Sequence, residues 1–227
     1  MKIISVVGAR PNLMKIAPFI SAIDIHNKKY KPIVNHYLVH TGQHYDADMS
    51  EIFFKQLNIS SADKYLKIGS GSHAQQVGKT MIEFEKVLEV EKPDWVVVVG
   101  DVNATLACSI TAKKQKIKLC HIEAGLRSND MNMPEEINRI VTDRLSDLLL
   151  APDNFSFNNL IQEGKRPYNV KMIGNIMIDT LEKNKSYATN ISLKNVIKKN
   201  TITNSTLYND EYILLTLHRP SNVDNER

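Results

Sequence analysis

Short runs of valine and isoleucine recur along this chain, and longer segments of helical period separate them. The run at residues 96–99 contains no polar residue, as expected for a strand that is buried on both faces of a sheet. Strands that alternate with helices at this spacing predict a parallel sheet with helices on both faces. The sequence therefore predicts an α/β fold with a Rossmann-like sheet. The expected strands are residues 2–7, 33–39, 64–68, 95–99, 118–122, 148–150, 170–173 and 212–217.

Four helices have recognisable ends. Pro11 suits the first turn of a helix, because its fixed φ is helical and its missing N–H is not needed there. Ser72 is a suitable N-cap for a helix that Pro93 ends. Residues 105–114 and 134–147 supply two more helices between predicted strands.

Composition argues against several classes of protein. The 227 residues include 29 Lys and Arg and 25 Asp and Glu, a net charge of +4, and the basic residues do not gather into a stripe. A nucleic-acid groove is therefore not expected. The apolar runs are far shorter than the roughly 20 residues that cross a bilayer, so no membrane segment is expected. The N-terminal apolar run is too short for a signal peptide, and Cys108 and Cys120 form no disulfide framework, so we expect a cytoplasmic protein.

The chain is expected to hold one complete domain and the beginning of another. Residues 184–209 are rich in asparagine and contain few large apolar side chains, which indicates a linker or the solvated edge of a second unit. The strand predicted at 212–217 follows, and a single strand cannot bury its own faces. We therefore predict an N-terminal Rossmann-like domain at residues 1–173. Residues 174–227 are predicted to be an interdomain segment and the truncated start of a second Rossmann-like domain.

Polar residues gather where the predicted strands end. Arg10 follows the first strand, Asp101 follows 95–99, Glu123 follows 118–122, and His218 follows 212–217. The carboxyl ends of parallel strands share one edge of a sheet, and ligands of open α/β sheets bind there. This edge is therefore the predicted site.

Each of these residues also has a structural interpretation. Arg10 is either a surface charge or an anion ligand at a helix N-terminus, and Asp101 is either a helix cap or a functional carboxylate. Glu135 is either a favourable negative charge in the first turn of a helix or a carboxylate that takes part in the chemistry. Glu123, next to a buried strand, must be either paired or catalytic.

Other local signals favour no cofactor and no metal. The residues at 69–71, Gly-Ser-Gly, lack the lysine of a phosphate-binding loop and indicate a turn. No G-x-G-x-x-G follows the first strand, which argues against a bound nicotinamide dinucleotide. His36 and His40 share one face of a strand but lack a third ligand at a matching spacing, so no metal site is predicted.

Several motifs occur in a fixed order along the chain. They are Gly8-Ala9-Arg10-Pro11 followed by Lys15, Gly100-Asp101, His121-Ile122-Glu123-Ala124-Gly125-Leu126-Arg127, Pro134-Glu135-Glu136-Ile137-Asn138-Arg139, Gly174-Asn175 with Asp179, and His218-Arg219. Together the motifs resemble those of the non-hydrolysing UDP-N-acetylglucosamine 2-epimerases. The third and fourth motifs are highly specific for that family.

The resemblance implies a fold, a reaction and a set of site residues. The fold is the glycosyltransferase-B arrangement of two Rossmann-like domains, of which this chain holds the first. The reaction is reversible C2 epimerisation of UDP-N-acetylglucosamine to UDP-N-acetylmannosamine, by elimination and re-addition of UDP through 2-acetamidoglucal and without a cofactor. The implied catalytic residues are Asp101, Glu123, Glu135 and His218, and the implied substrate contacts are Arg10, Lys15 and Arg139.

Two departures from the family pattern leave the substrate open. Asn12 stands where some members carry glutamate, and Met133 where some carry tryptophan, which favours a subgroup that includes 2-epimerases of UDP-2,3-diacetamido uronic acids. A hydrolysing 2-epimerase, a retaining glycosyltransferase and an inactive fragment or binding module are the alternatives. The expected partners are a UDP-sugar and, in the complete protein, a second copy in a homodimer. The isolated chain is expected to lack the complete activity.

Overall fold

The computed structural model describes residues 1–42, 53–200 and 215–216 of the chain. Within them a seven-stranded parallel sheet has the strand order β3-β2-β1-β4-β5-β6-β7. This sheet confirms the predicted Rossmann-like α/β fold. The strands are β1 (Lys2–Val7), β2 (Asn35–His40), β3 (Lys64–Tyr65), β4 (Trp95–Val99), β5 (Lys118–Ile122), β6 (Leu148–Ala151) and β7 (Val170–Met172).

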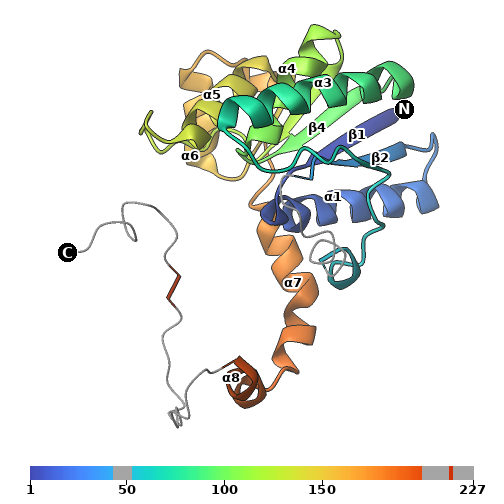
Figure 1. Cartoon of the computed structure of the whole chain (residues 1–227), viewed down its shortest axis with the longest axis vertical. Coiled ribbons are helices and arrows are strands. Elements are labelled where there is room, and N and C mark those ends of the chain that lie inside the picture. The colour runs from blue at the N-terminus through green and yellow to red at the C-terminus, as the bar shows by residue number, and fades with distance from the viewer. Residues whose placement is uncertain (43–52, 201–214, 217–227) are drawn as a thin grey trace. The chain divides into compact units, whose positions relative to one another are not determined.

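Helices cover both faces of the sheet (Figure 1). The 20-residue helix α1 lies on one face, and α3 and α4 lie side by side on the other. The helices are α1 (Arg10–Lys29), α3 (His73–Glu91), α4 (Asn103–Lys114), α5 (Pro134–Leu145), α6 (Asn154–Gln162), α7 (Ile176–Thr189) and α8 (Leu193–Asn200), with a short 3₁₀ helix at Pro167–Asn169.

Two large apolar cores, one on each face, hold these layers together at the centre of the sheet, and a third, smaller one packs β6 and β7 against α6. Alternate residues of β4 enter different cores, because successive side chains of a strand point to opposite faces. Val97 and Val99 pack with α1, whereas Val96 and Val98 pack with α3 and α4. A strand buried in this way needs the unbroken valine run that the sequence shows.

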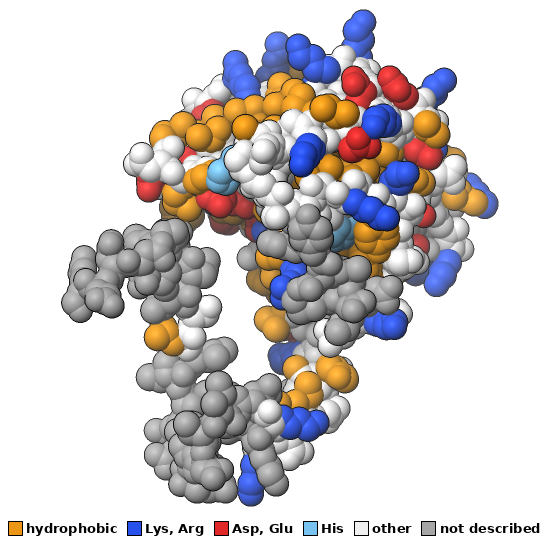
Figure 2. Space-filling model, viewed as in Figure 1, with side chains coloured by type: hydrophobic (Ala, Val, Ile, Leu, Met, Phe, Trp, Pro, Cys, Tyr) orange, Lys and Arg blue, Asp and Glu red, His pale blue; other side chains and the backbone are white. Residues whose placement is uncertain are grey.

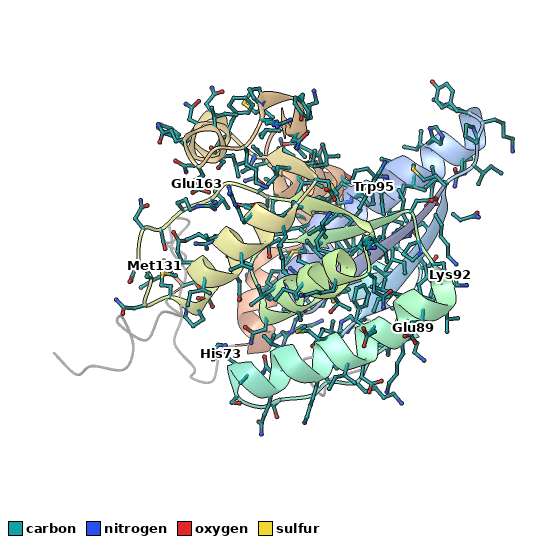
Figure 3. The ribbon with its side chains drawn as sticks, turned by 90° about the horizontal axis from the view of Figure 1, so that it is seen from above. His73, Glu89, Lys92, Trp95, Met131 and Glu163 are labelled. Atoms are coloured by element: carbon teal, nitrogen blue, oxygen red, sulfur yellow. The ribbon has the colours of Figure 1, made fainter. Side chains whose placement is uncertain are left out.

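The strand order reverses beside β1, and this reversal positions the site. The chain runs outward from β1 through β2 to β3, and then returns to place β4 on the other side of β1. The loops after β1 and β4 therefore diverge at the carboxyl edge, the usual place for a ligand in such sheets. In Figure 3, His73 and Met131 lie toward this edge, while Trp95, at the start of β4, and Lys92, at the end of α3, lie at the opposite one.

Several predicted bounds differ from the observed ones. The third strand was expected over residues 64–68, but it pairs only at Lys64 and Tyr65. The residues after Tyr65 form a loop that is hydrogen-bonded to the residues after β2; for example, the Ile68 N–H donates to the Thr41 carbonyl oxygen. The strand predicted at 212–217 lies outside the described residues, apart from two that belong to no helix or strand.

The asparagine-rich stretch contains helices that its composition did not predict. Helix α7 continues to Thr189 and α8 spans Leu193–Asn200. Asparagine lowers helix propensity by well under about 1 kcal/mol per residue, so the lysine, leucine and glutamate among these residues still support a helix. The chain divides into two compact units, Met1–Lys185 and Ser186–Arg227, and the predicted boundary at residue 173 stays a prediction.

Charged side chains of both signs are mixed over the face of the molecule shown in Figure 2. None of the helices among the described residues is long and apolar enough to cross a membrane.

Candidate active site

An ion pair joins two of the predicted site residues at the carboxyl edge. Lys15 lies in the second turn of α1, and Glu123 follows β5; the Lys15 ammonium contacts the Glu123 carboxylate. Each side chain is only 15% exposed. A carboxylate in such a place must be paired, and the structure supplies its partner from a helix 108 residues away in sequence.

Gly100 lies against this ion pair in a backbone conformation that favours glycine. Its φ is +68°, a conformation that L-residues with side chains rarely adopt. A Cβ there would lie 3.3 Å from Lys15 Nζ and 3.4 Å from Glu123 Oε2. The backbone of the β4 loop can therefore approach the two charges closely, and Asp101 is the next residue of that loop.

Asn12 ties the β1 loop to the end of β4. Its Oδ1 accepts hydrogen bonds from the N–H groups of Gly8 and Ala9 at 3.0 and 2.9 Å, and its Nδ2 donates to the Val99 carbonyl oxygen at 3.0 Å. The side chain is 2% exposed. Asn12 thus joins the two loops that diverge at the strand-order reversal, a role that sequence reasoning did not assign to it.

Glu123 adopts a backbone conformation that is unusual for glutamate. Its φ is +72°, in the left-handed region. Such a conformation costs of order 1 kcal/mol or more for a residue other than glycine, and strain of this kind clusters at functional sites. The N–H groups of Glu123 and Ala124 both donate to the Leu150 carbonyl oxygen at 3.1 Å, and these bonds hold the turn in place.

Asp101 is held by Arg139 of α5. Arg139 Nε and Nη2 both donate to Oδ2 of Asp101, at 3.0 and 2.6 Å, and Nη1 donates to Glu136 Oε2 at 2.7 Å. Oδ1 of Asp101 accepts no hydrogen bond from the described residues. Sequence reasoning expected Arg139 to contact substrate, and the structure shows its guanidinium between two carboxylates of the protein itself.

Glu136 is a buried anchor for this arrangement. Its side chain is 1% exposed, and its carboxylate accepts bonds from the N–H groups of Ser128 and Asn129 as well as from Arg139. Burial alone would raise the pKa of Glu136, but these hydrogen bonds outweigh it and hold the pKa below its usual value. The adjacent Glu135 differs: it is half-buried and makes no hydrogen bond or ion pair with any described residue.

Asn138 connects α5 to the same loop. Its Nδ2 donates to the Asp101 carbonyl oxygen at 2.7 Å and lies 3.4 Å from Asn103 Oδ1. Asn103 in turn bonds His73 and Gln76 of α3. Helices α3, α4 and α5 therefore meet at Asp101 through side-chain amides.

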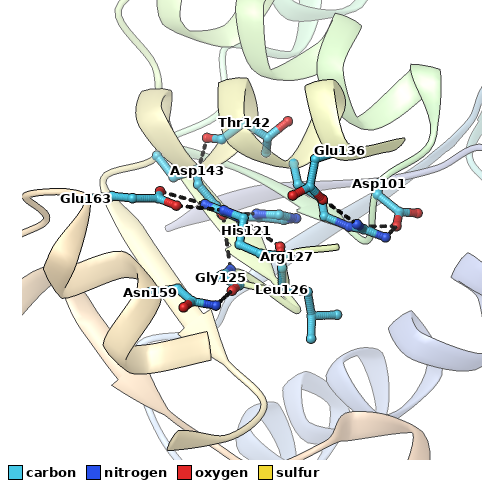
Figure 4. A network of polar contacts seen from close by, with 12 residues as sticks. Asp101, His121, Gly125, Leu126, Arg127, Glu136, Thr142, Asp143, Asn159 and Glu163 are labelled. Carbon is cyan, nitrogen blue, oxygen red and sulfur yellow. Dashed lines mark hydrogen bonds and ion pairs between the residues drawn. The ribbon is translucent and has the colours of Figure 1, made fainter. Parts of the chain in front are cut away.

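A second network joins His121, Asp143, Arg127 and Glu163, and its first three side chains are buried. His121 Nδ1 is 2.6 Å from Asp143 Oδ1, and His121 Nε2 is 2.9 Å from the Gly100 carbonyl oxygen. Arg127 extends the network from Asp143 to Glu163, with bonds of 2.7 to 2.8 Å (Figure 4). Burial would lower the pKa of Arg127, but its bonds to Glu163 and Asp143 raise it overall.

The remaining predicted site residues lie as follows. Arg10 begins α1 and is exposed, with no hydrogen bond or ion pair to any described residue. His218 lies outside the described residues. The structure therefore brings Lys15, Glu123, Asp101 and Arg139 to one edge, with Glu135 in the first turn of α5 beside the Arg139 cluster.

The two histidines of β2 are engaged in other contacts. His36 Nε2 is 2.9 Å from Ser5 Oγ, and His40 Nδ1 accepts the Gly42 N–H at 2.9 Å. Burial lowers the pKa of His40 to about 4, so its ring is neutral at pH 7. Among the described residues no group of three or more His, Cys, Asp or Glu side chains is placed to hold a metal ion.

Comparison with known proteins identifies relatives of this chain. A family model described as UDP-N-acetylglucosamine 2-epimerase matches residues 26–227. A curated relative of that name from Methanocaldococcus jannaschii is 44% identical over 227 residues, which are 100% of this chain and 59% of the relative. A UDP-2,3-diacetamido-2,3-dideoxy-D-glucuronate 2-epimerase from Pseudomonas aeruginosa is 42% identical and is likewise covered over 59% of its length.

Solved structures give the same result. The crystal structure of the Methanocaldococcus jannaschii UDP-GlcNAc 2-epimerase in complex with UDP-GlcNAc and UDP superposes with a TM-score of 0.87 at 42% identity, over 99% of this chain and 59% of that one. The chain thus spans about 59% of the length of these relatives. On the family model and these identities, the chain belongs to the UDP-N-acetylglucosamine 2-epimerase family.

Proposed function

We propose that the protein to which this chain belongs interconverts UDP-N-acetylglucosamine and UDP-N-acetylmannosamine by inverting C2. The proposal starts from family membership and from the relatives named for this activity. Because the chain spans about 59% of those relatives, the proposal concerns the chain together with the remaining part of their length.

The chemistry calls for charges of both signs close together. The C2 proton is not adjacent to a carbonyl group, so direct removal is unfavourable. When the C1–O bond to UDP breaks, positive charge develops at C1 and the C2 proton becomes acidic. Elimination then gives 2-acetamidoglucal and UDP, and re-addition on the other face inverts C2. This route needs carboxylates near C1 and C2 and cations near the leaving pyrophosphate.

The contacts at the site support a division of roles. Asp101 is fixed through one oxygen by Arg139, so its other oxygen is available to a developing positive charge. Glu135 has no partner among the described residues and is free to exchange a proton with C2. Arg10 is exposed and unpaired at the start of α1, where a diphosphate would also meet a helix N-terminus.

The Lys15–Glu123 ion pair beside Gly100 carries the proposal. It places one cation and one carboxylate, both largely buried, at the strand-order reversal. When a diphosphate approaches, the Lys15 ammonium can pair with it instead of with Glu123. The Glu123 carboxylate can then accept a proton or face the sugar. The positive φ of Glu123 adds backbone strain at this place, and strain of this kind clusters at functional sites.

Solvent-isotope incorporation tests the proposal. The chain would be continued with the remaining part of its Methanocaldococcus relative and supplied with UDP-N-acetylglucosamine in heavy water. We expect UDP-N-acetylmannosamine with deuterium at C2, because the proton is lost to and regained from exchangeable groups. Epimerisation with full retention of the original hydrogen would contradict elimination, and absence of any epimer from a folded chimera would contradict the activity.

A second substrate has one specific observation in its favour. The Pseudomonas aeruginosa relative, named for a UDP-2,3-diacetamido uronic acid, is 42% identical to this chain, close to the 44% of the archaeal relative. Competition between the two nucleotide sugars in the same assay decides between them. A higher kcat/KM for the diacetamido uronate would replace the first substrate and leave the C2 chemistry unchanged.

A further inference from the structure

The buried ring of His121 faces a hydrogen-bond acceptor at each nitrogen. Nδ1 is 2.6 Å from Asp143 Oδ1, and Nε2 is 2.9 Å from the Gly100 carbonyl oxygen. The side chain is 0% exposed, so bulk water does not reach either nitrogen. Carboxylate and carbonyl oxygens only accept hydrogen bonds, and each contact therefore requires a hydrogen between the two atoms.

A neutral ring beside an ionised Asp143 cannot satisfy both contacts. Neutral imidazole has one N–H and one lone pair, so in either tautomer the lone pair would face an oxygen. Such a repulsive contact is costly in a buried place where the effective dielectric constant is low. The His121–Asp143 pair must therefore hold one additional proton, either on the ring or on the carboxyl group.

The surroundings of Asp143 decide where that proton lies. Oδ2 of Asp143 accepts the Gly125 N–H at 3.0 Å and faces Arg127 Nη1 at 2.8 Å, and both donors stabilise the ionised carboxylate.

Each cation that contacts Asp143 directly also has that carboxylate as its ion-pair partner. His121 and Arg127 are the cations, and Asp143 and Glu163 are the anions. Lys165, in the segment after α6, is a further cation close enough to Asp143 to interact with it electrostatically. A buried charge is tolerated when it has a partner of the opposite sign, and His121, Arg127 and Asp143, the buried members of this network, each have one.

Gly100 is the residue through which this network reaches the site. Its carbonyl oxygen contacts His121, and its N–H donates to the Ile122 carbonyl oxygen at 3.1 Å. A Cβ added to Gly100 would meet Lys15 Nζ and Glu123 Oε2. Asp101 is the next residue. We propose that His121 is an imidazolium held by Asp143, and that in this form it is a positioning residue that fixes Gly100 and so sets Asp101 against Glu123. The consequence for catalysis rests on the proposed function, whereas the protonation state does not.

NMR of the ¹⁵N-histidine-labelled chain tests the protonation state without any assay of activity. The His121 signals are assigned by their loss in His121→Gln. We expect a hydrogen on both ring nitrogens at pH 7. His40 is the internal control, because its Nδ1 accepts a hydrogen bond and should carry only a lone pair at pH 7. A lone pair on either nitrogen of His121 at pH 7 would overturn the proposal.

A pair of variants tests the positioning role. Asp143→Asn removes the anion that holds the ring, and we expect the backbone amide signals of Gly100 and Asp101 to shift. Glu163→Gln is the matched control, because it alters the same charge network without contacting His121. It should leave those two signals in place. Unmoved Gly100 and Asp101 signals in folded Asp143→Asn would refute the positioning role. If that variant does not fold, His121→Gln replaces it with the same expected shift and the same refuting result.

Discussion

The Lys15 ammonium and the Glu123 carboxylate form an ion pair across the carboxyl ends of three neighbouring strands, β1, β4 and β5. Gly100 lies against both charges, and Asn12 joins the β1 loop to the end of β4 beside them. The proposed site is thus assembled from groups that also hold the fold together. Substitutions there should affect stability and chemistry to different extents at different residues.

Removal of the Lys15 charge should destabilise the fold measurably. Lys15→Met leaves the Glu123 carboxylate without its cation in a largely buried place, and we expect a loss of about 2 kcal/mol in the free energy of unfolding. Urea denaturation measures the change. Lys86→Met is the control: its partner Glu83 is three residues away on an exposed helix face, so it should change stability by less than about 0.5 kcal/mol. Equal effects would contradict the structural role of the Lys15–Glu123 pair.

The same substitution should change the free energy of unfolding much more at Glu136 than at Glu135. Glu136→Gln disrupts a buried carboxylate with three donor groups, so about 2 kcal/mol of stability should be lost. Glu135→Gln breaks no hydrogen bond among the described residues and should leave stability within about 0.5 kcal/mol.

In the complete enzyme, Glu135→Gln should nevertheless lower kcat by about 100-fold, because a carboxamide cannot transfer the C2 proton. Asp101→Asn and Glu123→Gln should lower kcat by a similar factor. Turnover within a few-fold of the unmodified enzyme in any one of these three variants would remove that residue from the proposed chemistry.

Gly125 should tolerate no side chain. Its φ is +86°, and a Cβ would overlap the Ser156 carbonyl oxygen and lie within 2.9 Å of Leu160 Cγ. Gly125→Ala should therefore cost about 3 kcal/mol or more. Gly78→Ala is the matched control, because a Cβ there meets nothing within 4 Å in the middle of α3. It should stabilise the chain by about 0.5 to 1 kcal/mol. Thermal unfolding compares the two, and similar melting temperatures would contradict this packing.

His40 should make the chain less stable as the pH falls. Its pKa is about 4 in the folded chain and near 6.5 when unfolded, so the unfolded state binds the proton first. The free energy of unfolding should fall between about pH 6.5 and pH 4, by about 3 kcal/mol in total, and the contribution should be constant above that range. His40→Asn should show a smaller decline, measured by urea denaturation at several pH values. An equally steep decline in this variant would assign the effect to other groups.

The sequence by itself determined the layers of this fold. Apolar periodicity predicted seven of the observed strands, because the alternation of faces is a local property of a strand. The valine run of β4 marked the centre of the sheet, and Pro11, Ser72 and Pro93 marked helix ends. Periodicity did not predict the end of β3, because pairing with β2 decides where that strand ends. It also did not predict helices α7 and α8, because helix propensity is only a weak guide to helix formation.

Motif order also determined the family and named the charged residues of the site, but only the tertiary structure decided their partners. Arg139 holds Asp101 and Glu136, Lys15 holds Glu123, and His121 links Asp143 to Gly100. Most of these contacts join residues that are far apart in sequence, and they depend on strand order and register. Local patterns carry no information on either, so the hydrogen-bond partner of a buried charge becomes known only when the strands lie side by side.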